Sequence, residues 1–242
     1  MKKIFIEQFI GWRTQEILWL VFSIFSITAL SIYWDDTPLG IIAATTGMAY
    51  TILAGKGKIS CFIFGLINTP LYAYLAFKSG YYGDLTLNAY YFIMMFPGLF
   101  HWLKNRSQDP EEGIKRTKLS NRGRLILAAL CIGAIIPTWA ILKVCGGAQP
   151  LCDSATNILS IAAMILTVRR AIEEWALWIL VNAIEVFMWY KAWLIGQGNV
   201  SILLMWLLFL ANGVYLLCLW LRIEKRNNLK PLHAKQREEP QQ

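Results

Sequence analysis

The chain has 242 residues, of which 57% are hydrophobic and 16% are charged. Soluble domains are usually less apolar and carry charges at about a quarter of their positions. The long apolar runs therefore exclude an ordinary water-soluble domain and indicate a protein that crosses the bilayer several times. The net charge of +8 does not indicate a nucleic-acid partner, because the basic residues lie in short loops between apolar runs.

Eight segments are predicted to span the membrane. Most are long enough, at about 1.5 Å per residue, to cross a hydrocarbon core of about 30 Å, although the second and sixth are short. In chain order the predicted spans are Ile17–Tyr33, Ile41–Leu53, Ile59–Phe77, Leu85–Trp102, Leu125–Val144, Ser154–Val168, Trp175–Leu194 and Val200–Leu221.

The distribution of charge tests this count independently. With eight spans, both termini lie on one side together with the loops that follow the second, fourth and sixth spans. All but three of the 23 Lys and Arg residues then share that side, and the exceptions are Lys78, Lys143 and Lys191. Because positive charge is retained in the cytoplasm, both termini are predicted to be cytoplasmic.

Two sets of three spans resemble each other. Leu66-Ile67-Asn68 matches Leu180-Val181-Asn182, and Thr46 and Ser160 precede the two asparagines by the same interval. The lone fifth span returns the chain across the membrane, so both sets have the same orientation, as in transporters built from parallel repeats. The predicted parts are 1–37 with an extra N-terminal helix, 38–104 and 153–222 as three-helix bundles, 105–152 as a loop and linker helix, and 223–242 as a polar tail with a disordered end.

The seventh span carries the main candidate site. Polar and aromatic residues recur there every three or four positions, which places them along one face of a helix. A carboxylate and an amide at membrane depth are costly unless they face protein or water. Trp175 and Trp193 are interpreted as interfacial anchors, as are Trp12, Trp19, Trp34, Trp102 and Trp220. The four middle residues are predicted to bind substrate: Trp178, Asn182, Glu185 and Trp189.

Four further residues are candidates on other spans. Asn68, Asn88 and Asn212 offer amide donors and acceptors, and Tyr91 shares a helical face with Asn88. The alternative role for each asparagine is hydrogen bonding between helices, which is common in membrane proteins.

Catalytic chemistry is not indicated. The only histidines are His101 and His233, which leaves no histidine metal cluster and no Ser-His pair. No Gly-rich phosphate loop is present, and we expect no cofactor, no metal and no catalytic residue. Cys145 and Cys152 share a loop on the outer side, where a disulfide is one alternative and two free thiols the other.

Three runs resemble the PnuC family of bacterial nicotinamide riboside transporters. They are ISCFIFGLIN at 59–68, DSATNILSIAAMILTVRR at 153–170 and EEWALWILVN at 173–182. The resemblance covers roughly residues 40–220. It implies a fold similar to the SWEET sugar transporters, with two three-helix bundles joined by a linker helix, and a homotrimer in membrane lipid.

The resemblance also implies facilitated diffusion of nicotinamide riboside, made one-way by phosphorylation in the cytoplasm. The candidate residues suit this substrate, because amides bind ribose hydroxyls and an aromatic face binds a flat cationic ring. Alternatives are a proton-coupled carrier that uses Glu185 and a carrier of thiamine or riboflavin. Two further hypotheses come from other functional classes. They are a membrane-embedded enzyme and a structural or sensory membrane subunit.

Overall fold

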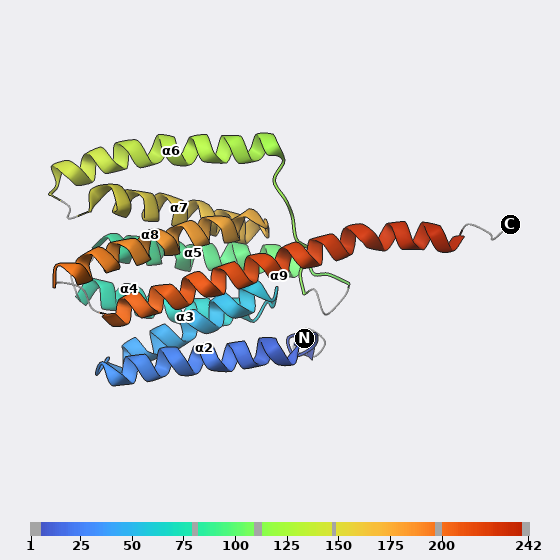
Figure 1. Ribbon diagram of the computed structural model, residues 1–242, viewed down its shortest axis with the longest axis horizontal. Coiled ribbons are helices and arrows are strands. Elements are labelled where there is room, and N and C mark those ends of the chain that lie inside the picture. Colours follow the sequence, from blue (N-terminus) through green and yellow to red (C-terminus); the bar gives the residue numbers. More distant parts are fainter. Residues whose placement is uncertain (1–5, 79–81, 109–112, 147–148, 197–199, 239–242) are drawn as a thin grey trace.

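The computed structural model describes residues 6–78, 82–108, 113–146, 149–196 and 200–238. Eight helices dominate these ranges, and they pack roughly side by side along one direction (Figure 1). Labelled as in Figure 1, they are α2 (Thr14–Tyr33), α3 (Pro38–Gly55), α4 (Cys61–Lys78), α5 (Tyr82–Lys104), α6 (Asn121–Val144), α7 (Pro150–Arg169), α8 (Glu173–Leu194) and α9 (Val200–Glu238).

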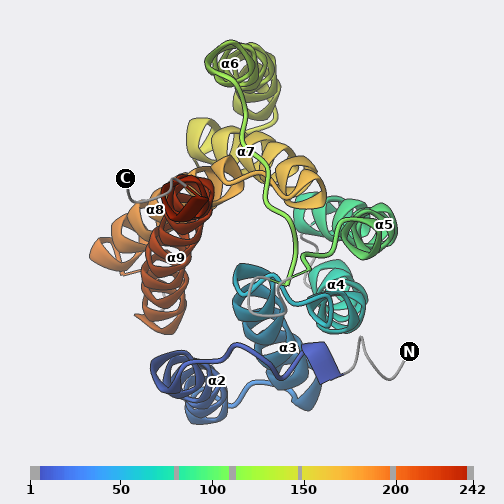
Figure 2. The ribbon, with the colours of Figure 1, turned by 90° about the vertical axis from the view of Figure 1, so that its right-hand side faces the viewer.

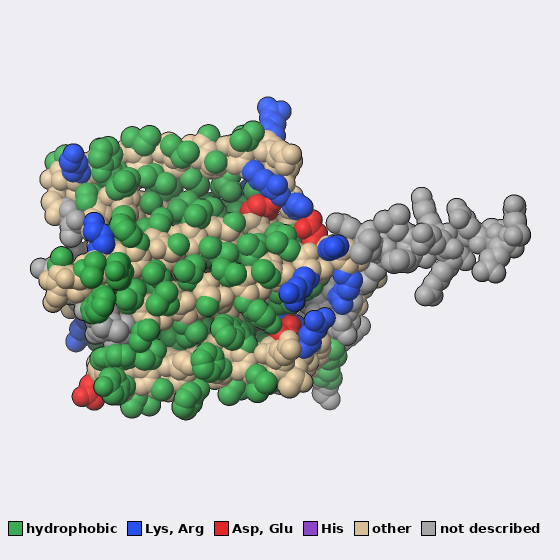
Figure 3. All heavy atoms as spheres, in the orientation of Figure 1, with side chains coloured by type: hydrophobic (Ala, Val, Ile, Leu, Met, Phe, Trp, Pro, Cys, Tyr) green, Lys and Arg blue, Asp and Glu red, His purple; other side chains and the backbone are tan. Residues whose placement is uncertain are grey.

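Each of the eight predicted spans corresponds to a helix. In the part of the chain that the structure describes, seven helices are long and apolar enough to cross a membrane; α5 is as long but more polar. Large apolar side chains cover much of the surface (Figure 3). Such a surface is stable against lipid rather than water, and the chain is a multi-pass membrane protein.

Most of the helices are longer than the spans predicted for them, and α3 and α9 show two different reasons. The short second span becomes α3 because the Thr37 hydroxyl accepts a hydrogen bond from the Gly40 amide at 3.1 Å and Pro38 suits the first turn. At the other end of the chain, α9 continues past the predicted end at Leu221 to Glu238. Charged residues such as Glu, Lys and Arg form helices well in water, so leaving the apolar segment does not end the helix. Residues 239–242, where disorder was expected, lie outside the described residues.

Six helices form a closed ring. In order of contact they are α3, α4, α5, α7, α8 and α9, and α9 returns to α3. Figure 2 shows this ring from one end, with the remaining two helices outside it. Over the described residues, α2 packs against α3 and α9, whereas α6 packs along α7 and reaches α8 through the ion pair of Arg124 with Glu173. The ring therefore consists of two runs of three consecutive helices that meet at α5–α7 and at α9–α3.

The two ends of the ring differ in charge. The N-terminal segment, the connections α3–α4, α5–α6 and α7–α8, and the extension of α9 all lie at one end (Figure 1), where Lys and Arg side chains gather (Figure 3). We call it the basic end. At the opposite end, three lysines lie over aromatic rings of their own helices: Lys78 over Tyr74, Lys143 over Trp139 and Lys191 over Phe187.

Apolar side chains fill the ring toward its basic end. This basic-end cluster includes at least one buried residue from each of the six ring helices and Ile114 from the connection between α5 and α6. Its buried members are Ala54, Ile59, Cys61, Phe62, Met95, Trp102, Ile114, Met164, Ile172, Trp175, Leu216 and Trp220. The cluster closes the ring at this end.

Three of the tryptophans interpreted as interfacial anchors belong to this cluster instead. Trp102, Trp175 and Trp220 are buried. The Trp102 indole donates to the Thr167 carbonyl at 2.9 Å and the Trp220 indole to the Gly55 carbonyl. An indole ring suits a lipid interface and a protein core equally well when its N–H has an acceptor, which is why the sequence did not distinguish the two. Cys145 and Cys152, for which a disulfide was one alternative, are free thiols.

Candidate substrate-binding site

One face of α8 carries four of the predicted site residues. Trp178, Asn182, Glu185 and Trp189 follow at helical spacing; Asn182 is buried and the others are partly exposed. Gly213 of α9 packs next to this face, because a Cβ there would lie 3.7 Å from the Asn182 amide nitrogen. No hydrogen bond from a described residue reaches the Asn182 amide, so its donors and acceptor are available to a ligand.

An aromatic pair lies at the basic-end side of this face. The ring centroids of Tyr91 on α5 and Trp178 on α8 are 6.2 Å apart, and the rings are inclined at 61°. The Tyr91 hydroxyl is within hydrogen-bonding reach of Ser160, and the Trp178 indole nitrogen lies 3.5 Å from the Thr167 hydroxyl. Both rings pack against the basic-end cluster. The pair therefore forms an aromatic floor directly above the closed end.

Three carboxylates lie further toward the opposite end. Glu185 lies near Thr156 and Trp189, and it is close enough to Asp84 and Asp153 for their charges to repel its own. The three come from α8, α5 and α7, which are neighbours in the ring. None of them forms an ion pair among the described residues. This side of the site is thus negatively charged.

Asn88 lies one helical turn from Tyr91 and is buried. Its amide nitrogen donates to the Asp84 carbonyl of its own helix at 2.8 Å. Asn157 on α7 makes the same contact with the Asp153 carbonyl at 2.7 Å. Near their N-terminal ends, α5 and α7 thus share one local arrangement, in which an asparagine amide donates to the carbonyl of the aspartate four residues before it.

The remaining two predicted residues connect helices. The Asn68 amide donates to the Ala43 carbonyl of α3 at 2.6 Å. Gly47 permits this approach, since a Cβ there would lie 2.9 Å from the Asn68 amide nitrogen. Asn212 is fully buried and accepts a hydrogen bond from the Trp19 indole of α2 at 2.9 Å. Both contacts are of the interhelical kind that the sequence left as an alternative. The other six predicted residues lie on α5 and α8, on either side of α7.

The sequence interpretation missed the contribution of α7. Thr156, Ser160 and Thr167 are buried on this helix, and each lies beside a polar or aromatic group of the site. A signal was present, because these hydroxyl residues and Ala163 recur at intervals of three or four. Small residues of this kind let neighbouring helices approach closely, which brings Tyr91 and Trp178 together across α7.

Known proteins resemble this chain over most of its length. A sequence profile of the family described as nicotinamide mononucleotide transporter matches residues 37–222. The nicotinamide riboside transporter PnuC of Neisseria mucosa is 33% identical over 229 residues, which cover 92% of this chain and 86% of the relative. The protein of the same name from Haemophilus influenzae is 30% identical over 221 residues, which cover 90% and 94%.

A solved structure resembles the fold. It is described as the crystal structure of the vitamin B3 transporter PnuC, and it superposes with a TM-score of 0.78 at 32% sequence identity. The superposition covers 92% of this chain and 97% of the solved one.

Proposed function

Because this chain belongs to the PnuC family of nicotinamide riboside transporters, we propose that it carries nicotinamide riboside by facilitated diffusion. Like its relatives, the chain is a transporter and not an enzyme. In the proposed mechanism the ring opens alternately to the two sides of the membrane, and phosphorylation in the cytoplasm traps the substrate.

The observation that carries the proposal is the aromatic floor below the polar face of α8. A cationic nicotinamide ring binds against an aromatic face, and Tyr91 and Trp178 offer such faces 6.2 Å apart. Asn182, Asn88 and Glu185 supply donors and acceptors for the ribose hydroxyls and the carboxamide. We assign Trp189 to the same site, at the turn beyond Glu185, and give Asn68 and Asn212 a supporting role between helices.

The charge of the site favours the riboside over the mononucleotide named in the family description. A phosphate group is usually held by Arg or Lys, whereas Glu185, Asp84 and Asp153 repel an anion. The three lysines of the opposite end lie over aromatic rings of their own helices instead. A positively charged ring without phosphate is the better match.

We propose that the two runs of ring helices are three-helix bundles, with α6 as the linker helix and α2 as the extra helix, as in the SWEET fold. Among the described residues α6 packs mainly along α7, outside the ring, which supports this arrangement. The corresponding parts are residues 1–37, 38–104, 105–152, 153–222 and 223–242. The exposed apolar face of α6 is suited to lipid and to contact with other copies in a homotrimer. The basic end is the cytoplasmic end in the bacterial inner membrane.

Calorimetry with purified protein tests the substrate and the site together. Nicotinamide riboside should bind to the wild type, and Asn182→Ala and Trp178→Ala should each weaken binding about tenfold or more. Asn68→Ala is the matched control, because the same amide is removed from an interhelical contact; its binding should change much less. Unchanged binding in both Asn182→Ala and Trp178→Ala would show that the pocket lies elsewhere. Binding of the mononucleotide as tight as that of the riboside would contradict the charge argument.

Two alternatives are tested by related measurements. Coupling to protons through Glu185 predicts uptake into liposomes that depends on a pH gradient in the wild type and not in Glu185→Gln; facilitated diffusion predicts no dependence in either. Thermal stabilisation of the protein by nicotinamide riboside, thiamine and riboflavin separates the vitamins.

A further inference from the structure

Residues 113–120, which lead into α6, cross the basic end of the ring (Figure 2). We call this segment the strap. Its first part is held at the end of α5, where the Lys115 amide donates to the Asn105 carbonyl at 2.9 Å. Its second part is held by the turn between α7 and α8, where the Thr117 amide donates to the Arg170 carbonyl at 2.9 Å and the Ile172 amide to the Thr117 carbonyl at 3.0 Å. The strap thus joins the two halves of the ring.

Three residues of the strap pack into the ring. Ile114 is fully buried in the basic-end cluster. The Arg116 guanidinium lies over the Trp220 ring, 4.7 Å from its centroid. Gly113 has φ +71 and lies so close to the α3–α4 turn that a Cβ would come within 2.2 Å of the Gly57 carbonyl oxygen. Opening this end of the ring therefore requires the strap to leave at least one half.

Beneath the strap lies a carboxylate without a hydrogen bond. Glu174 is 1% exposed, and neither of its carboxylate oxygens has a hydrogen-bond partner among the described residues. The nearby Thr167 hydroxyl instead donates to the Ala163 carbonyl at 3.0 Å. Arg116 is the cation whose charge acts on Glu174, and the uncharged Tyr50 and Cys61 side chains also lie near it.

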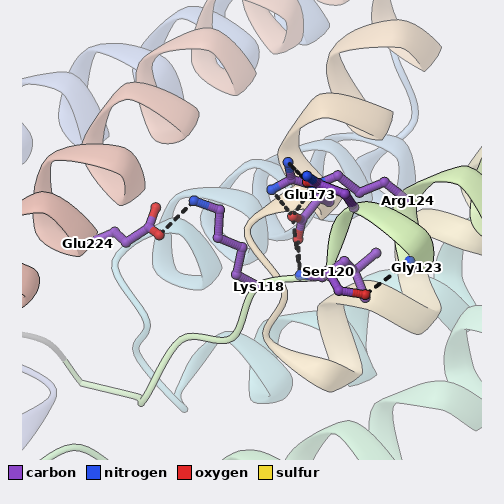
Figure 4. Close-up of polar contacts among 8 residues, drawn as sticks. Lys118, Ser120, Gly123, Arg124, Glu173 and Glu224 are labelled. Atoms are coloured by element: carbon purple, nitrogen blue, oxygen red, sulfur yellow. Dashed lines mark hydrogen bonds and ion pairs between the residues drawn. The ribbon is translucent and has the colours of Figure 1, made fainter.

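The adjacent glutamate is bound quite differently. Figure 4 shows Glu173 facing Arg124. The two side chains form an ion pair at 2.8 Å, and Glu173 also accepts a hydrogen bond from the Leu119 amide. Glu173 therefore fastens the end of the strap, whereas Glu174 lies buried below its middle. A buried carboxylate that lacks donors is destabilised relative to a hydrated one.

We propose that Glu174 and Arg116 form the gate at the basic end of this carrier, an inference that rests on the transport function proposed above. In the closed state Glu174 has lost its water, and Arg116 offsets part of the cost. When the strap lifts, water reaches the carboxylate and the cost disappears. The charge of Glu174 therefore favours opening, and the charge of Arg116, together with its packing on Trp220, favours closure.

Cys61 is a built-in reporter of this gate, because its free thiol is fully buried in the basic-end cluster. A protein with Ser at positions 131, 145, 152 and 218 keeps Cys61 alone. Its rate of labelling by N-ethylmaleimide in membranes measures how often the gate opens. Arg116→Gln should raise this rate roughly tenfold and Glu174→Gln should lower it several-fold, since a buried unpaired charged group costs more than a neutral one. The double variant should label more slowly than Arg116→Gln but somewhat faster than Glu174→Gln, because the packing of Arg116 on Trp220 is also lost.

The opposite signs separate a gate from loosened packing. If both single variants label faster, or if neither changes the rate, the proposal is overturned. Arg116→Lys keeps the charge and should increase labelling less than Arg116→Gln. Glu224→Gln is the matched control, because it removes the exposed ion pair with Lys118 of the strap (Figure 4); its rate should equal that of the parent.

Riboside uptake by the parent protein distinguishes the two proposals. If the parent protein takes up no riboside but the variants label as expected, the transport proposal is wrong and the proposed movement of the strap still holds. Normal uptake without the labelling pattern would remove the gate alone.

Discussion

The two basic turns of the ring have similar sequences and different environments. Lys56 and Lys58 follow α3, whereas Arg169 is the last residue of α7 and Arg170 follows it. Lys56 is buried and pairs with Glu16 at 2.8 Å, whereas the Arg170 guanidinium is buried against the Lys115 carbonyl of the strap and lies 3.5 Å from the His101 ring.

The N-terminal segment therefore holds the first turn and the strap holds the second. Lys58 extends this difference, since its ammonium donates to the carbonyls of Glu7 at 2.9 Å and Ile10 at 2.7 Å. An ion pair and several carbonyls fasten the first turn to α2 and the segment before it. The second turn is fastened to the element that we propose to move. The halves of the ring are thus similar in sequence and unequal in how firmly their basic ends are held.

Removing the buried ion pair should have the largest effect. Glu16→Ala leaves the Lys56 ammonium buried with the Gly11 carbonyl, at 3.0 Å, as its remaining hydrogen-bond partner. We expect the free energy of unfolding to fall by about 3–5 kcal/mol and Tm, measured on purified protein in detergent, by roughly 10 °C. Glu16→Met with Lys56→Met removes both charges and should recover most of the loss. Equal losses in the single and double variants would mean that packing, not charge, holds this turn.

The second turn should be less costly to break. Arg170→Met removes a charged donor to the Lys115 carbonyl, and a hydrogen bond of this kind contributes about 1.5–3 kcal/mol. Arg169 is exposed, so Arg169→Met is the matched control and should change Tm by no more than about 1–2 °C. The inequality between the two turns is wrong if Arg170→Met destabilises the protein as much as Glu16→Ala.

A pH series should also distinguish the first turn. Burial, followed by repulsion from Lys56, lowers the pKa of Lys58 from 10.5 to about 8. The unfolded chain then binds more protons than the folded one between pH 8 and 10.5, so this residue makes stability rise with pH across that window. Lys58→Met lacks the effect, and the Tm advantage of the wild type should widen by a few degrees from pH 8 to 10. A difference in Tm that does not change with pH would mean that the Lys58 ammonium is hydrated in the folded protein.

The smallest effect is expected at the surface of the strap. Lys118 and Glu224 are 2.9 Å apart, but the Lys118 side chain is 50% exposed. Such pairs contribute at most about 1 kcal/mol, so Lys118→Ala should leave Tm nearly unchanged, in low and in high salt. A large loss would indicate that the strap depends on its exposed contacts.

The sequence predicted the helices and most of the candidate site because both depend on local patterns. Hydropathy and charge located all eight helices, and helical spacing selected Trp178, Asn182, Glu185 and Trp189 as one face. Contacts between distant segments could not be predicted in this way. The Trp19 indole and the Asn212 amide that pair in the structure are separated by 193 positions.

The burial of charged side chains could not be predicted from the sequence either. Lys56, Lys58 and Arg170 read as solvated loop residues, since a basic residue outside an apolar run is usually exposed. Their burial follows from the N-terminal segment and the strap folding back over the ring, and nothing in the periodicity of either segment indicates that. Glu174 is adjacent to Glu173 and identical in type. The two side chains lie on different sides of the helix, so Glu173 fastens the strap whereas Glu174 is buried without a hydrogen-bond partner among the described residues.

The length of α9 bears on how this protein can be handled. Its 39 residues extend about 58 Å at about 1.5 Å per residue, nearly twice the thickness of the hydrocarbon core. The far end of the helix projects well away from the ring (Figure 1). A fluorescent protein or an affinity handle fused behind Glu238 would therefore stand clear of the mouth of the ring, whereas the same fusion directly before Ile6 would lie close to Glu7 and Ile10, whose carbonyls bind Lys58.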